Sequence, residues 1–323
     1  AKLHQATDNQ EAATADLNQA ITELNQRINP ENPNQYEVDG NWADMEIVEE
    51  PIWLKGEDEP LRWAARRTRH GPLISDVLDT ASPMALRWTA LDPDDTTLNA
   101  FLGVNRATNW TEFRQGLNQL VVPSLNFVYA DVEGNIGYFA PGRIPIRAQG
   151  EGMFPVPGWD SAYEWTGWIP YDELPQVYNP SAGYIATANN RIVNNDYPYL
   201  ISNSWAEPYR AERIVELIEE MSRDGEKISL HDMWRMQSDQ VSNQARALLP
   251  FLLALTGEDD RQNAALERLQ AWDGHVHRTS VTASIYEAWY VYLGRAMFED
   301  DLSGDLYQKM AERNHPIFLQ SIM

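Results

Sequence analysis

The chain has no cysteine among its 323 residues, which excludes disulfide bonds, thiolate nucleophiles and cysteine-ligated zinc sites. It also lacks the apolar run of roughly 20 residues that a membrane-spanning helix needs, and its longest core-like run is Ala247–Leu255. Basic residues are few, because 25 Lys and Arg stand against 48 Asp and Glu, for a net charge of -23. Such a chain repels nucleic-acid phosphates and anionic lipids, so we expect neither a nucleic acid nor a membrane as its partner.

Several signatures of catalysis and metal binding are missing as well. The sequence contains no Gly-x-Ser-x-Gly elbow and no glycine-rich phosphate loop. His275 and His277 resemble a metal-binding pair, but no third ligand lies nearby in the sequence, so we expect no metal there. His70, beside Gly71-Pro72, is more typical of a structural hydrogen bonder than of a catalyst. The many carboxylates single out no glycosidase pair.

What the chain does have is apolar and aromatic content. Its residues are 43% hydrophobic and include 12 Trp and 14 Tyr, which indicates a folded chain with a large core. Residues 36–190 show short runs with strand periodicity between Gly, Pro and Asp, whereas residues 208–323 show apolar residues three or four apart. We therefore predict an α+β fold, with strands mostly before residue 190 and helices mostly after it. The predicted strands are Met45–Glu49, Pro51–Lys55, Trp63–Thr68, Ala85–Thr89, a hairpin over 125–139 and Gly183–Asn190. The predicted helices are Asn109–Leu120, one that begins at Tyr209, Ser229–Gln240, Ala245–Leu255, Asn263–Trp272 and Thr282–Met297.

The first 28 residues form a separate segment in this interpretation. Leu17, Ile21, Leu24 and Ile28 recur at helical spacing and predict an amphipathic helix. Pro30 ends it. Residues 1–28 are thus a helix-like head ahead of the main domain.

The stretch from Leu125 to Asn190 is the centre of the predicted organisation. A hairpin around Gly134-Asn135 opens it. The residues from 142 to 180 are rich in Pro, Gly and Trp, and we predict that they form an ordered, aromatic-lined loop region where a ligand binds.

Amide chemistry around Asn189 is the remaining catalytic candidate. A side-chain amide held rigidly at the end of a strand can donate a hydrogen bond to a developing oxyanion. Arg210, which opens a predicted helix about twenty residues later, could orient that amide or the charged end of a nucleophile. An Asn-Asn pair after a strand is also typical of an ordinary turn, and the residues alone leave both interpretations open.

A set of motifs in a fixed order resembles the penicillin acylase family. The chain resembles the interior of the β chain of such an enzyme, from about residue 28 to beyond 290. The motifs are Asn29-Pro30-Glu31-Asn32-Pro33-Asn34-Gln35-Tyr36, Thr68-Arg69-His70-Gly71-Pro72, Asn126-Phe127-Val128-Tyr129-Ala130-Asp131, Gly142-Arg143-Ile144-Pro145-Ile146-Arg147, Pro155-Val156-Pro157-Gly158-Trp159, Ala188-Asn189-Asn190, Pro208-Tyr209-Arg210-Ala211-Glu212-Arg213-Ile214 and Gln237-Ser238-Asp239.

The resemblance implies an N-terminal-nucleophile fold, in which stacked antiparallel sheets lie between helical layers (αββα). It also implies an amidohydrolase that releases acyl groups from amines. In this family the precursor cuts itself, a Ser becomes the first residue of the β chain, and its own α-amine serves as the base. By motif match, Asn189 is the side-chain oxyanion donor and Arg210 the arginine that supports it. The implied partners are a small amide substrate, an α chain and the N-terminal part of the β chain. The resemblance also implies a periplasmic or secreted protein, although no signal sequence is found here.

The departures from the family pattern set further expectations. Residue 1 is Ala and the first serine is Ser75, so we expect the nucleophile to be absent from this chain. Residues 29–323 are then a partial β-chain domain. Gln19 and Thr22 stand at the positions where the family has the carboxylates that bind calcium, so we expect no calcium and no cofactor.

The alternative interpretation is a non-catalytic relic or binding module of the same fold. β-Lactam side chains, acyl-homoserine lactones and lipopeptide acyl chains all remain open as substrates.

Overall fold

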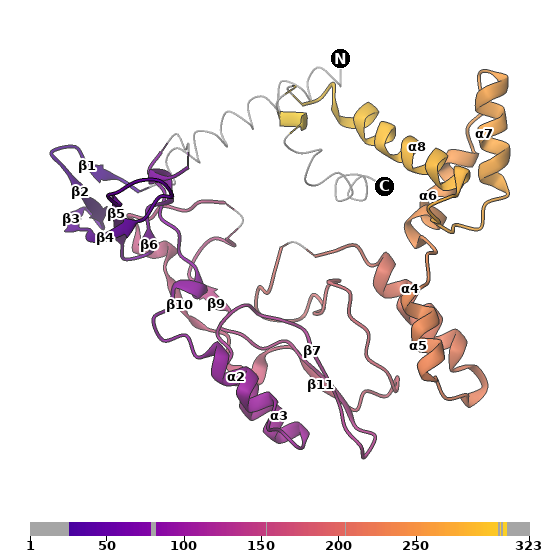
Figure 1. Ribbon diagram of the computed structural model, residues 1–323, viewed down its shortest axis with the longest axis horizontal. Coiled ribbons are helices and arrows are strands. Elements are labelled where there is room, and N and C mark those ends of the chain that lie inside the picture. The colour runs from indigo at the N-terminus through magenta and orange to yellow at the C-terminus, as the bar shows by residue number, and fades with distance from the viewer. Residues whose placement is uncertain are drawn as a thin grey trace. The chain divides into compact units, whose positions relative to one another are not determined.

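The computed structural model describes residues 26–78, 82–152, 154–203, 205–302, 304 and 306–308. The chain divides into two compact units. The first holds the residues up to Ile185 together with Val193–Asn203, and the second holds Ala186–Ile192 and the residues from Ser204 onward. The strands belong to the first unit, and the helices after residue 208 belong to the second (Figure 1). This division confirms the predicted order of strands and helices.

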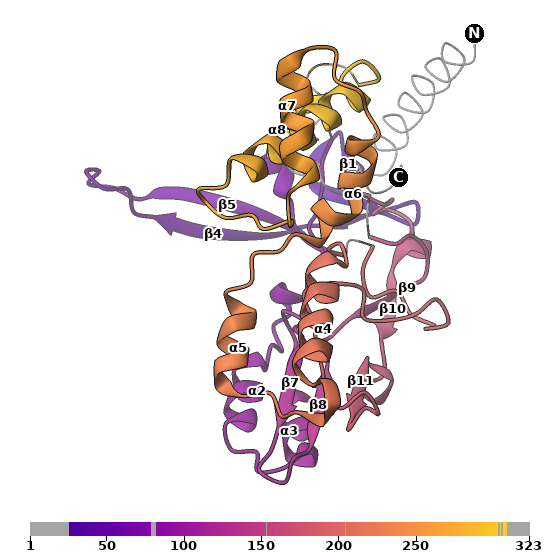
Figure 2. The ribbon, with the colours of Figure 1, turned by 90° about the vertical axis from the view of Figure 1, so that its right-hand side faces the viewer.

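Two antiparallel sheets open the first unit. Their strand orders are β1-β2-β3 and β4-β5-β6. The run predicted before Glu50 and the start of the run predicted after it form one continuous strand, β4, which pairs with β5 along its whole length as a long hairpin (Figure 2). The rest of the second run, residues 53–55, lies beyond the end of this strand. The strands are β1 (Ile28–Asn29), β2 (Asn32–Val38), β3 (Asn41–Asp44), β4 (Glu46–Ile52), β5 (Leu61–Thr68) and β6 (Gly71–Pro72).

Two sequence-based predictions in this region differ from the structure. Ile28 belongs to β1 and not to a helix, because Glu37 N donates to Arg27 O and ties this segment to β2. Gln26 and Arg27 are not helical either, and the rest of the predicted helix, residues 1–25, lies outside the described residues. The predicted strand Ala85–Thr89 is wrong, because Ala85 makes a single bridge to Leu73 and residue 89 already begins a short 3-10 turn.

The predicted hairpin over 125–139 is confirmed as β7 (Phe127–Ala130) and β8 (Ile136–Phe139), which share a sheet with β11 (Gln176–Tyr178) in the order β11-β8-β7. Asp131 shapes the turn, because its Oδ1 accepts from Glu133 N at 3.0 Å and from Asn135 N at 2.9 Å. The turn is therefore a side-chain-stabilised connection of the type that Asp favours.

Two helices pack against one another in the same unit (Figure 1). α3 (Trp110–Leu117) was predicted, and it begins where Asn109 Oδ1 accepts from Glu112 N. α2 (Thr97–Val104) was not predicted. The two backbones approach closely because they meet at Gly103 and Gly116, where a Cβ on Gly103 would lie 2.7 Å from the Gly116 Cα.

The segment between residues 142 and 180 is more regular than predicted. It contains β9 (Pro145–Arg147) and β10 (Trp165–Trp168), which pair with each other, as well as β11. Side chains from this segment, α3 and the β7–β8 hairpin form one core. Its buried members are Phe113, Leu117, Tyr129, Phe139, Ile144, Ile169 and Leu174.

The second unit is helical. The predicted helices are confirmed with shifted bounds, and several begin at a side-chain cap, for example Ser242 before α6 and Ser280 before α8. Within the described residues, no helix combines the length and the apolarity that crossing a membrane requires. The helices are α4 (Tyr209–Met221), α5 (Leu230–Gln237), α6 (Asn243–Leu253), α7 (Asp260–Gln270) and α8 (Val281–Phe298). Their core contains Ala245, Leu248, Leu252, Leu269, Tyr286 and Tyr290.

Candidate active site

Asn189 lies in an irregular segment of the second unit, and the strand predicted over Gly183–Asn190 is wrong. Its backbone has a φ of +63°, in the left-handed region that Asn tolerates better than most residues. The main-chain oxygen of Asn189 accepts from Ala206 N at 2.9 Å, and Asn190 Oδ1 accepts from Ala188 N at 3.0 Å. These local bonds hold the Asn189 backbone, which belongs to none of the sheets formed by the described residues.

Arg210 reaches Asn189 from the first turn of α4. Its guanidinium donates to Asn189 Oδ1 at 2.9 Å and to Ala188 O at 2.7 Å. Both side chains come from the second unit, so the pair predicted from the sequence is brought together within one compact body.

The contact determines which face of the Asn189 amide points away from the arginine. A guanidinium has only donors, so it must face the amide oxygen. The Nδ2 group is then left as the outward donor, and no acceptor for it exists among the described residues. Asn189 and Arg210 are both exposed, which leaves this donor accessible to a ligand.

A bidentate ion pair anchors α4 one turn beyond Arg210. Arg213 Nε and its NH2 group donate to the two carboxylate oxygens of Asp239 at 2.9 and 2.8 Å. These bonds raise the pKa of Arg213 and lower the pKa of Asp239. Glu216 accepts from Arg213 and from Asn243, which continues the network to the first turn of α6. The helix that carries Arg210 is thereby tied to the segment between α5 and α6.

Sequence reasoning did not identify Arg213 and Asp239 as members of this site. Both stand inside motifs that the sequence analysis singled out, and Arg213 follows Arg210 by three residues, which places the two on neighbouring positions of one helix face. That spacing was the available signal.

A pocket of about 490 Å³ opens beside Arg210. This volume falls within the range of small-molecule sites. Its walls combine apolar side chains with the anchored ion pair, and all of them belong to the second unit. The lining residues are Glu207, Tyr209, Arg210, Arg213, Ile214, Leu217, Met236, Asp239, Val241, Ser242, Asn243 and Gln244.

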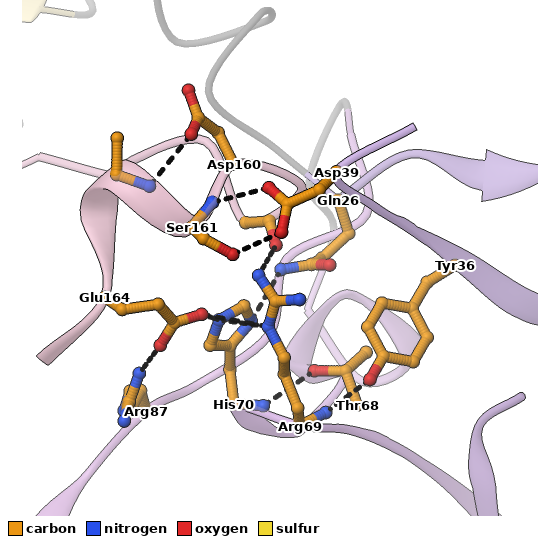
Figure 3. Close-up of polar contacts among 12 residues, drawn as sticks. Gln26, Tyr36, Asp39, Thr68, Arg69, His70, Arg87, Asp160, Ser161 and Glu164 are labelled. Carbon is orange, nitrogen blue, oxygen red and sulfur yellow. Dashed lines mark hydrogen bonds and ion pairs between the residues drawn. The ribbon is translucent and has the colours of Figure 1, made fainter. Parts of the chain in front are cut away.

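A second polar cluster surrounds Glu164 in the first unit (Figure 3). One carboxylate oxygen of Glu164 lies 2.8 Å from His70 Nε2 and 2.9 Å from Arg69 Nε, and the other contacts Arg87. Gln26 Nε2 lies 3.2 Å from His70 Nδ1. The Arg69 main-chain N–H donates to the hydroxyl of Tyr36 at 2.9 Å. The cluster connects the β5–β6 turn to the segment before β10.

The protonation states in this cluster follow from its contacts. Burial lowers the pKa of His70 and outweighs the opposing effect of Glu164. Burial also tends to raise the pKa of Glu164, but its bonds to His70 and Arg87 outweigh burial and lower it. Because the Glu164 carboxylate only accepts, the proton of the neutral ring lies on Nε2, and Nδ1 accepts from Gln26. His70 is thus a neutral connector, as the structural interpretation of its motif predicted.

No group of three or more His, Asp or Glu side chains suited to a metal ion occurs among the residues that the structure describes. His277 Nδ1 instead lies 2.8 Å from the hydroxyl of Thr279. The positions considered for calcium, Gln19 and Thr22, lie outside the described residues.

Comparisons with known proteins agree with the resemblance found in the motifs. The family model described as Penicillin amidase matches residues 12–321, so the match begins inside the segment that we had set apart as a head. The acyl-homoserine lactone acylase QuiP of Pseudomonas fluorescens Pf-5 is 34% identical over 294 residues, which are 84% of this chain and 35% of that protein. Penicillin G acylase of Escherichia coli is 31% identical over 273 residues, or 81% of this chain and 31% of that protein.

Among solved structures, the thermostable penicillin G acylase of Alcaligenes faecalis superposes with a TM-score of 0.74 at 25% identity, covering 88% of this chain and 52% of that one. This likeness confirms the predicted α+β fold of the N-terminal-nucleophile type. The chain spans about a third of the length of the curated relatives that it matches. The family match covers nearly all of the chain, and we conclude that the chain belongs to the penicillin amidase family.

Proposed function

We propose that this chain is the part of an acyl-releasing amidohydrolase that supplies the side-chain donor of the oxyanion hole. The observation that carries the proposal is the bond from Arg210 to Asn189 Oδ1, which leaves the Nδ2 donor exposed and oriented. In this role Asn189 is the catalytic residue and Arg210 the positioning residue.

The chemistry follows from where charge develops. When a nucleophile attacks an amide carbonyl, negative charge builds up on the carbonyl oxygen, and a donor already held in place stabilises that charge without reorganising. The positive guanidinium on Oδ1 polarises the Asn189 amide, which strengthens Nδ2–H as a donor. The adjoining pocket offers space for part of the substrate.

The remaining groups belong to polypeptide outside this sequence in our proposal. These are the Ser nucleophile, the α-amine that serves as its base, the backbone oxyanion donors and the α chain. The relatives carry the names penicillin acylase and acyl-homoserine lactone acylase, so we propose an acyl amide of one of these classes as substrate. The proposed reaction uses no metal ion. We propose from the family alone that the protein is periplasmic or secreted.

The test is the Asn189→Ala substitution in the complete enzyme that contains this chain. Removal of one oxyanion donor typically lowers kcat by about 100- to 1000-fold, and we expect a loss of this size with KM changed much less. The measurement is steady-state hydrolysis of a chromogenic phenylacetyl or long-chain acyl amide. Asn118→Ala is the matched control, because Asn118 is an exposed asparagine at the end of α3 in the first unit.

Near-normal turnover by the Asn189→Ala enzyme would remove Asn189 from the mechanism. Turnover of the same amide by the 323-residue chain alone would contradict the proposal that the nucleophile lies elsewhere.

A further inference from the structure

A second pocket, of about 280 Å³, lies within the first unit and shares no residue with the candidate active site. Most of its wall is apolar. The apolar part comes from the segment between β6 and α2 and from the Pro-rich segment between β9 and β10. Its lining residues are Gln26, His70, Ile74, Met84, Ala85, Leu86, Arg87, Arg147, Gly152, Phe154, Pro155, Val156, Pro157, Gly158, Asp160, Tyr163 and Trp165.

Most charged and titratable groups of this pocket are already satisfied. Arg87 forms an ion pair with Glu164, and His70 is neutral and has a hydrogen-bond partner at both ring nitrogens. Asp160 accepts from Ala162 N at 2.8 Å and so caps a short 3-10 turn (Figure 3).

Arg147 is the exception. It is partly buried, and no hydrogen bond or ion pair holds its guanidinium among the described residues. Its neighbours are the Trp165 ring, whose centroid lies 5.9 Å from the guanidinium carbon, and the backbone of Gly152. A Cβ at Gly152 would lie 2.9 Å from a guanidinium nitrogen, so the glycine makes room for the cation.

An unpaired, partly buried cation costs free energy, which an anion in the same pocket offsets. Burial lowers the pKa of Arg147, which agrees with a guanidinium that has no acceptor in the described part of the chain. The net charge of -23 opposes general attraction of anions to this chain, so an anion bound here would owe its affinity to local contacts.

We propose that this pocket binds a carboxylate attached to an apolar body, with Arg147 as the charge partner. The planar guanidinium matches a carboxylate in a two-bond arrangement, and the apolar wall covers the attached hydrocarbon. The carboxylate comes either from a small organic acid or from an acidic side chain of a polypeptide segment. This proposal does not depend on the proposed function.

The experiment is calorimetric titration of the 323-residue chain with octanoate, with octanamide as the uncharged match. We expect one octanoate per chain and about 10- to 100-fold weaker binding of octanamide, because a charge-assisted contact is lost. Arg147→Gln should weaken octanoate binding by a similar factor. Arg106→Gln, at an exposed position just beyond the C-cap of α2, should leave octanoate binding unchanged.

The blocked peptide acetyl-Leu-Asp-Leu-amide separates the two sources. Tighter binding of the peptide than of octanoate indicates a polypeptide carboxylate, and the reverse order indicates a small acid. Equal binding of octanoate and octanamide, or octanoate binding that survives Arg147→Gln, would overturn the proposal. The comparison of the two ligands needs no variant, so it decides the matter even if Arg147→Gln fails to fold. Absence of binding by both octanoate and the peptide would also overturn the proposal.

Discussion

The polar cluster around Glu164 and the pair formed by Asn189 and Arg210 contain similar chemical groups but have different roles. In the first, both carboxylate oxygens of Glu164 and both ring nitrogens of His70 have partners. In the second, Arg210 occupies only the oxygen of the amide. A network in which every polar group has a partner holds segments of the chain together. A network that leaves one oriented donor without a partner can bind a ligand through that donor. This difference separates a structural cluster from a candidate active site on the same chain.

The strongest test of this contrast is Glu164→Ala. It leaves Arg69, Arg87 and His70 without their shared acceptor, and the loss of one partner from a fully buried ion pair costs about 3–5 kcal/mol. The Glu164 side chain is 26% exposed, so we expect a smaller loss, about 2 kcal/mol in the free energy of unfolding. Urea unfolding followed by circular dichroism measures it.

Two controls accompany this test. Glu299→Ala, in an exposed i,i+4 pair with Arg295, should leave the urea midpoint unchanged. Asn189→Ala should behave like this surface control. If Asn189→Ala instead destabilises the chain as much as Glu164→Ala, the distinction between the two clusters fails.

The next largest effect concerns the other side of the comparison. Arg210→Ala in the complete enzyme frees the Asn189 amide to rotate, and misplacement of a catalytic group costs up to about 100-fold. We expect kcat to fall about 10- to 100-fold, less than with Asn189→Ala. Arg210→Lys keeps the charge but not the planar geometry, so it should restore only part of the lost kcat.

The double variant tests whether the two residues act together. Because both residues act on one donor, Arg210→Ala should lower kcat little further in an Asn189→Ala background. Additive losses would show that Arg210 acts independently.

The smallest effect is the pH dependence of stability. The pKa of His70 lies below its ordinary value of 6.5 in the folded chain, so the unfolded chain binds more protons as pH falls through that value. The pKa of Glu164 is also lowered from 4.5, so its contribution is present above that value and is lost as pH falls further. Both groups therefore make the chain less stable as the pH falls.

Urea midpoints measured between pH 7.5 and 5.5 test the His70 part of this dependence. We expect a decline below about pH 6.5, the ordinary pKa of histidine, and a flatter profile for His70→Gln. An unchanged slope in His70→Gln would show that another group controls this range.

Much of the fold could be predicted from the sequence because local patterns determine it. The hairpin of β7 and β8 and the helices from α4 to α8 carry their own periodicity, and α5 to α8 also begin at side-chain caps. Predictions failed where long-range contacts decide the outcome. The run over Gly183–Asn190 has strand-like composition, yet it pairs with no strand in the described part of the chain and is irregular. α2 was missed because its packing depends on the meeting of Gly103 with Gly116.

By itself, the sequence determined the family, the order of strand-rich and helix-rich halves, and the candidates Asn189 and Arg210. These depend on motif order and on periodicity along the chain, which need no folding to be seen. Only the tertiary structure decided that Arg210 holds the oxygen of the Asn189 amide and that Asp239 anchors the helix of Arg210. It also decided that Arg147 lies in a pocket without a polar partner among the residues that the structure describes. A hydrogen bond requires atoms within about 3 Å of each other, and that proximity is set by how distant segments pack and not by their order.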